Sequence, residues 1–86
     1  MIDLRKILID TFKNSDIPQE IDELKIGDIE EWDSLGNFNL LLSIEQTLDI
    51  QFDIESMEKL ISIEEIKREI EHVLSHRWNR FSSKKS

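Results

Sequence analysis

Apolar residues recur at helical spacing in two parts of the chain, one near each end. Over residues 2–14 the spacing is i, i+3, i+4, which is typical of a helix that buries one stripe. The residues of this stripe are Leu4, Ile7, Leu8, Thr11 and Phe12. A second stripe follows Ser62-Ile63-Glu64-Glu65, a segment with the form of a capping box. It consists of Ile66, Ile70, Val73 and Leu74. The pattern predicts one helix in each region.

The apolar residues of the central segment, residues 34–48, do not fit a single stripe. At about 100° per residue they form two nearly opposite sectors. The first sector holds Leu40, Leu41, Ile44 and Leu48, and the second holds Leu35, Phe38 and Leu42. Because the second sector shares its side with polar residues, we expect it to be at least partly exposed, while the first lines the core. The alternative is that a small bundle buries the second sector against Trp32 or Ile29.

Two connections separate these helices. Proline cannot supply a backbone N–H and disfavours helical geometry before it, so the first helix is expected to stop at residues 15–18. Residues 15–33 then form a long loop, packed through its own apolar residues and turning at Gly27. Those residues are Ile21, Leu24, Ile26, Ile29 and Trp32. Residues 50–53 have no partner strand and are interpreted as a turn, in which Asp53 caps a short helix over residues 54–59.

These elements predict an all-α fold, a bundle of three longer helices plus a short third one, with the long loop between helices one and two. A chain of 86 residues supports one small core, because a domain of this size buries only about 60% of its unfolded surface. We therefore expect a single domain over residues 1–81, followed by a disordered polar tail over residues 82–86.

Composition narrows the possible functions. The formal charge of −8 opposes binding to nucleic acids and anionic lipids and favours partners with positive surfaces.

No metal site is expected, because the chain has no cysteine. His72 and His76 form a helical pair with Glu65 and Glu69 nearby, but such a pair is a weak metal motif. The longest apolar runs fall short of the roughly 18 residues that span a membrane. These features predict a cytoplasmic protein that is not an integral membrane protein, and we expect it to be a monomer.

Ser34 stands at the predicted start of the central helix. The first turn of a helix carries unpaired N–H groups and about half a unit of positive charge, so a phosphate ester on this hydroxyl would be stabilised there. The alternative is that Ser34 is an ordinary N-cap residue, with Asp33 adding favourable charge. The position makes Ser34 a candidate modification site.

Trp32-Asp33-Ser34-Leu35-Gly36 and the helices that follow resemble the acyl carrier proteins over nearly the whole chain. The resemblance implies a four-helix acyl-carrier fold in which Ser34 carries 4'-phosphopantetheine, with Asp33 and Leu35 beside it. Coenzyme A is the source of this group, and a phosphopantetheinyl transferase attaches it. Its thiol holds an acyl, aminoacyl or related intermediate as a thioester.

The resemblance also implies partners, namely a loading enzyme and a downstream synthase or transferase, while the carrier itself is not an enzyme. The partner surface would contain Leu35, Phe38, Leu42, Glu45 and Asp49. Gly36 and Asn39 occupy positions where many relatives have acidic residues, which favours a dedicated set of partners. The pentapeptide looks like those of free-standing carriers in secondary metabolism or cell-surface glycan pathways, while the cargo stays open.

Two other functions deserve comparison. An unmodified helical adaptor would bind a protein through Leu35, Phe38 and Leu42. A small hydrolase would need a general base and oxyanion donors beside Ser34, and the glycine that precedes the serine in a nucleophile elbow is missing.

The C-terminal residues 75–86 are basic and contain two aromatics. We interpret them as a continuation of the last helix, whose cations match its negative end; the alternative is contact with a partner or an acidic surface. The residues concerned are Arg77, Trp78, Arg80, Phe81, Lys84 and Lys85.

Overall fold

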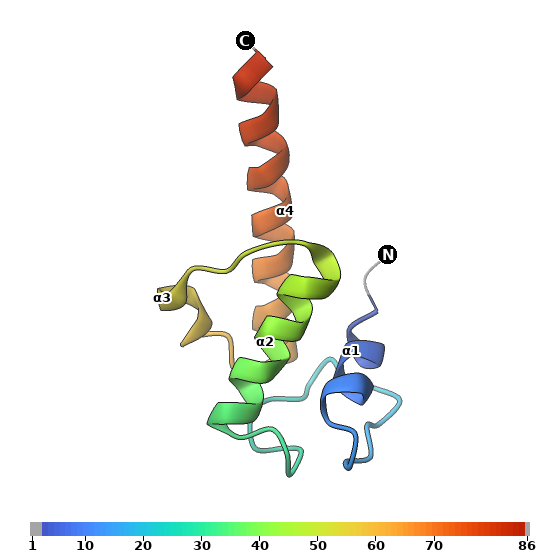
Figure 1. Cartoon of the computed structure of the whole chain (residues 1–86). Coiled ribbons are helices and arrows are strands. Elements are labelled where there is room, and N and C mark those ends of the chain that lie inside the picture. The colour runs from blue at the N-terminus through green and yellow to red at the C-terminus, as the bar shows by residue number, and fades with distance from the viewer. Residues whose placement is uncertain (1–2, 86) are drawn as a thin grey trace.

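The computed structural model describes the backbone of residues 3–85 and the side chains of residues 3–75. Its helices are α1 (Leu4–Thr11), α2 (Ser34–Leu48), α3 (Ile54–Met57) and α4 (Ile63–Lys85). α1 and α3 lie on opposite sides of α2 in Figure 1, and α4 runs behind α2. Within residues 3–85 no strand is formed, which confirms the predicted small all-α fold.

The helix boundaries follow from local hydrogen bonds. Asp3 caps α1 by accepting a hydrogen bond from the Lys6 backbone N–H at 3.1 Å. α1 ends at Thr11, earlier than the expected stop at residues 15–18, because Phe12 leaves helical geometry with φ −107° and ψ 66°. Its ring is buried and stacks on Trp32 with centroids 6.1 Å apart. The end of α1 therefore coincides with a tertiary contact of Phe12, three residues before the stop that the sequence predicts at residues 15–18.

The ends of the later helices agree with the predictions in part. The capping box of α4 is confirmed, since the Ser62 Oγ accepts from the Glu65 N–H at 3.2 Å. Asp53 stands at the N-cap position of α3, but its side chain makes no capping hydrogen bond, contrary to the expected role. Its backbone carbonyl accepts the first helical hydrogen bond, from the Met57 N–H at 2.9 Å.

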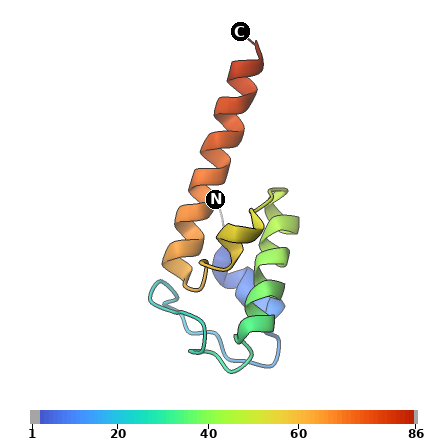
Figure 2. The same ribbon diagram turned by 90° about the vertical axis from the view of Figure 1, so that its left-hand side faces the viewer.

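The backbone of α4 is helical as far as Lys85, so residues 82–85 continue the helix instead of forming the expected disordered tail. Neither glycine nor proline occurs after Gly36, so no residue of this kind interrupts α4. Both views show its C-terminal half extending past the other helices (Figures 1 and 2). Ser86, the side chains of Trp78 and Phe81, and the basic side chains that follow Ser75 lie outside the described part, so their predicted roles stay predictions.

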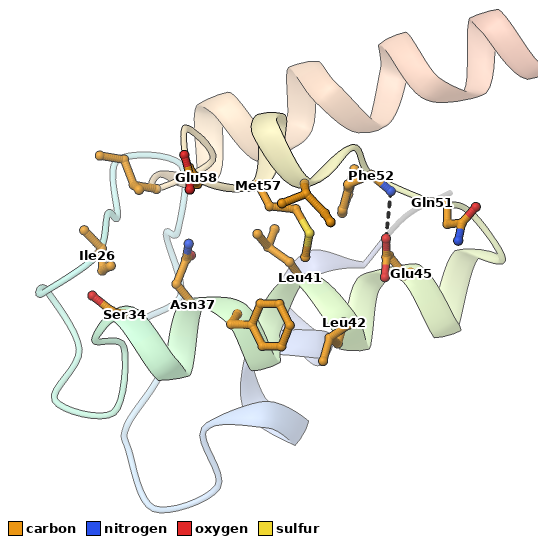
Figure 3. Close-up of a pocket in the computed structure, with 13 residues that line it drawn as sticks. Ile26, Ser34, Asn37, Leu41, Leu42, Glu45, Gln51, Phe52, Met57 and Glu58 are labelled. Carbon is orange, nitrogen blue, oxygen red and sulfur yellow. Dashed lines mark hydrogen bonds between the residues drawn. The ribbon is translucent and has the colours of Figure 1, made fainter.

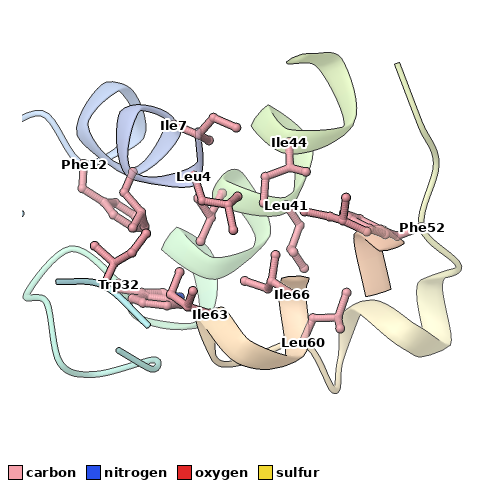
Figure 4. Close-up of a cluster of buried hydrophobic side chains, with 14 of the residues drawn as sticks. Leu4, Ile7, Phe12, Trp32, Leu41, Ile44, Phe52, Leu60, Ile63 and Ile66 are labelled. Atoms are coloured by element: carbon pink, nitrogen blue, oxygen red, sulfur yellow. The ribbon is translucent and has the colours of Figure 1, made fainter. Parts of the chain in front are cut away.

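The core is formed by α1, α2, α4 and the long loop (Figure 4). α2 contributes the predicted Leu40, Leu41 and Ile44, while Leu48 is partly buried against the cluster. The loop contributes Ile21, Ile29 and a fully buried Trp32, so it is packed as the apolar pattern predicts. The other large, fully buried side chains are Phe12, Leu8, Ile63, Ile66 and Ile70.

The long loop is also pinned to the start of α4 by backbone pairing that the sequence does not predict. Lys25 and Ser62 form an isolated antiparallel bridge. On its two sides, the Ile26 N–H donates to the Ile61 carbonyl at 2.7 Å and the Ile63 N–H to the Leu24 carbonyl at 3.0 Å. The loop that leads to Ser34 is thus fixed to the bundle.

Gly27 makes the predicted turn inside this loop. Its φ of +94° lies in the region that favours glycine, and its N–H donates to the Trp32 carbonyl at 2.8 Å.

None of the helices over the described residues is both long enough and apolar enough to span a membrane.

Candidate functional site

Ser34 is the first residue of α2, and its side chain is exposed. The residue before it, Asp33, is the N-cap, because its Oδ1 accepts a hydrogen bond from the Gly36 N–H at 2.8 Å. The alternative in which Ser34 caps the helix is therefore wrong. Among residues 3–75 no side chain or backbone group is hydrogen bonded to the Ser34 hydroxyl, so capping leaves this oxygen accessible for chemistry.

Gly36 explains how the turn before Ser34 comes so close to α2. A Cβ added at Gly36 would lie 2.0 Å from the Glu31 carbonyl oxygen and 3.2 Å from a ring carbon of Phe12. A glycine at this position could leave room for a partner or a prosthetic arm to approach the backbone. In the structure that space is taken by the chain itself, so Gly36 serves the packing of the site.

A groove of about 680 Å³ lies between α2 and α3, with Ser34 at its rim (Figure 3). Part of its apolar lining comes from Leu41 and Leu42 on α2, from Met57 on α3 and from Phe52 in the connection between them. The other lining residues are Ile26, Asn37, Phe38, Glu45, Gln51, Ile54, Glu58 and Ile61. Sequence periodicity does not reveal this groove, because it is bounded by segments from four parts of the chain.

The second apolar sector of α2 is exposed, as expected. Leu35, Phe38 and Leu42, here called the apolar strip, are 70%, 49% and 36% exposed. The alternative in which the long loop buries them is wrong. Ile54 is 80% exposed on α3 and also lines the groove. No sequence pattern marks Ile54 as a site residue, because a four-residue helix is too short to show periodicity.

The two acidic residues predicted for the partner surface lie in different settings. Glu45 is partly buried, and its Oε2 accepts the Phe52 N–H at 2.7 Å (Figure 3). It thereby holds the connection to α3 against α2, a structural role that the sequence did not predict. Asp49 is exposed and ends α2 with φ 54° and ψ 50° in the left-handed region. Contact of either residue with a partner stays a prediction.

His72 does not line the groove that contains Ser34. It is exposed on α4 and lines a separate hollow with Lys59, Arg68 and Glu69. The side chain of His76 lies beyond the described residues, so the predicted histidine pair stays untested. Through residue 75, no three His, Cys, Asp or Glu side chains are grouped so that they could hold a metal ion.

Comparison with known proteins returns no match of the chain to a family model, a curated protein or a solved structure.

Proposed function

We propose that this protein is an acyl carrier protein that bears 4'-phosphopantetheine on Ser34 and presents a thioester-bound intermediate to partner enzymes. The observation that carries the proposal is an exposed hydroxyl at the first position of a 15-residue helix, on the rim of an apolar groove. Because Asp33 occupies the N-cap, this hydroxyl has no capping function in the fold.

Attachment requires a transferase that brings coenzyme A to the exposed hydroxyl. The Ser34 Oγ attacks the phosphorus next to pantetheine, forming a P–O bond while the pyrophosphate P–O bond breaks. Adenosine 3',5'-bisphosphate leaves with the electron pair, and a base of the transferase takes the hydroxyl proton. The positive end of α2 favours the phosphodiester that results. When bound, the prosthetic group supplies a thiol that forms thioesters.

The groove beside Ser34 gives the tethered cargo a place against the bundle. It presents apolar side chains from α2 and α3, with the polar groups of Asn37, Gln51 and Glu58 around them. Such a lining suits the arm or a short apolar chain. Which intermediate is carried depends on the enzyme that loads it.

The apolar strip begins next to Ser34 and provides the contact surface for partner enzymes. The chain carries a formal charge of −8, so a partner with basic residues around an apolar centre would be complementary to it. A strip of three residues supports moderate affinity, which lets the carrier leave one enzyme for the next. The tether then raises the local concentration of the cargo at each partner.

The test is incubation of the purified protein with coenzyme A and a phosphopantetheinyl transferase of broad specificity, followed by intact mass measurement. We expect a mass gain of one phosphopantetheine in the unaltered protein and none in Ser34→Ala. Ser75→Ala, which removes an exposed hydroxyl on α4, is the matched control and keeps the gain.

Two results would contradict the proposal. If several transferases leave the folded protein unmodified, the unmodified adaptor becomes the better interpretation, since the exposed apolar strip supports binding without any prosthetic group. If the protein hydrolyses esters without added enzyme and Ser34→Ala does not, the hydrolase hypothesis returns.

A further inference from the structure

Asn37 is the one buried polar side chain in the described part of the molecule, at 7% exposure. It lies one helical turn after Ser34 on α2 and lines the groove. In Figure 3 its side chain rises from α2 toward the segment that carries Glu58. A buried amide is retained only where its hydrogen bonds are satisfied.

The Asn37 side chain joins two segments that are distant in sequence. Its Oδ1 accepts a hydrogen bond from the Trp32 Nε1 at 2.9 Å. Its Nδ2 donates to the Leu60 carbonyl at 3.1 Å. Trp32 belongs to the turn just before Ser34, and Leu60 belongs to the connection that leaves α3. One amide therefore ties the turn that presents the hydroxyl to the opposite side of the groove.

We propose that Asn37 is a positioning residue for the modification of Ser34, an inference that rests on the proposed carrier function. Stacking on Phe12 places the Trp32 ring in the core, while the hydrogen bond to Asn37 sets the direction in which the indole N–H points. Since Asp33 and Ser34 follow Trp32 directly, this orientation determines where the hydroxyl stands relative to the groove. Directional pairs of this kind specify one geometry, whereas apolar contacts tolerate sliding.

The consequence concerns the chemical step more than the docking of the transferase. Group transfer is sensitive to displacements of about 1 Å, because the attacking oxygen must meet the phosphorus in line. Docking depends on the exposed apolar strip, which Asn37 does not belong to. Loss of the Asn37 hydrogen bonds should therefore lower kcat for phosphopantetheinyl transfer and leave KM for the carrier nearly unchanged.

The experiment measures steady-state transfer kinetics with a fixed transferase and increasing concentrations of carrier. Asn37→Leu removes both hydrogen bonds at similar volume, and we expect kcat to fall about tenfold with KM within about twofold. Trp32→Phe removes only the indole donor and keeps the bond to Leu60, so we expect a smaller loss of about threefold. Ile70→Ala is the control, since it removes a core side chain on α4 that does not line the groove.

Circular dichroism establishes that each variant is folded under the assay conditions. In addition, the indole N–H resonance of Trp32, identified by its loss in Trp32→Phe, should shift and exchange faster with solvent in Asn37→Leu. In Ile70→Ala it should keep its position. If Asn37→Leu does not fold, Trp32→Phe is the test: a lower kcat supports the proposal, and an unchanged kcat contradicts it.

The inference is overturned if folded Asn37→Leu keeps its kcat, or if Ile70→Ala loses as much kcat as Asn37→Leu does. In either case, modification of the unaltered protein would leave the carrier function standing. Absence of modification in the unaltered protein would remove both proposals together.

Discussion

The two apolar faces of α2 are similar in composition and very different in surroundings. The buried face, formed by Leu40, Leu41 and Ile44, belongs to one core cluster with residues of α1, α4 and the long loop. The apolar strip on the other side borders the groove and is open to solvent. The burial of an apolar helical residue therefore depends on what the rest of the chain places against it, and not on its own hydrophobicity.

The two faces of α2 also have different roles, since one stabilises the fold and the other serves the proposed function. Burial of the first face contributes to the free energy of unfolding, because apolar area is removed from water there. The strip contributes little to it and is left for contact with other molecules, as exposed apolar patches often are. Substitutions on the two faces should consequently change different measured quantities.

The largest difference is expected in stability. Leu40→Ala should lower the free energy of unfolding by about 2–5 kcal/mol, because Leu40 is completely buried and its removal leaves a cavity. Leu35→Ala, on the open face, should change it by no more than about 0.5 kcal/mol. Urea denaturation followed by circular dichroism measures both. Similar losses in the two variants would show that the strip is part of the core.

Gly36→Ala tests the packing at the point where α2 begins. Helix propensity alone predicts a gain of up to about 1 kcal/mol, whereas the contact with the Glu31 carbonyl predicts a loss of about 1–3 kcal/mol through overpacking. We expect the loss to prevail, since the backbone of the loop is pinned at residues 24–26. The same denaturation experiment, with exposed Asn39→Ala as control, should show a loss only at Gly36. A gain at both positions would contradict the close contact.

The smallest effect concerns the strip as a docking surface. Leu35→Ser should raise the KM of the transferase for the carrier several-fold, with little change in kcat. This increase corresponds to a loss of about 1 kcal/mol of binding free energy. Ile9→Ser on α1 is the control, because Ile9 is also an exposed apolar residue and does not line the groove. Equal effects of the two substitutions on KM would exclude a specific role for the strip.

Local pattern was sufficient for much of this fold. Periodicity predicts the three longer helices and the buried face of α2, and the apolar residues of the long loop predict its packing. Likewise, the pattern predicts that Ser34 stands at a helix start. These predictions succeed because each depends on spacing and capping within a few residues, which the chain order expresses directly.

Other features of the site could not be predicted from the order of residues. In the sequence, Asn37 is not distinguished from the other polar residues of α2. Its hydrogen-bond partners are Trp32, which precedes it, and Leu60, which lies 23 residues after it. From the sequence, Gly36 is only a weak helix former. The structure shows that a side chain at this position would collide with the Glu31 carbonyl. Both depend on segments that meet only after the chain has folded.

The amino-acid order alone thus accounts for which segments become helices, for the capping box at the start of α4 and for where the candidate hydroxyl stands along the chain, because these depend on short-range hydrogen bonds and periodicity. Folding in three dimensions settled how the long loop is pinned to the start of α4, which groups lie against Gly36 and Asn37, and where the groove opens. These depend on the close packing of distant segments, and such packing has no signature in local spacing.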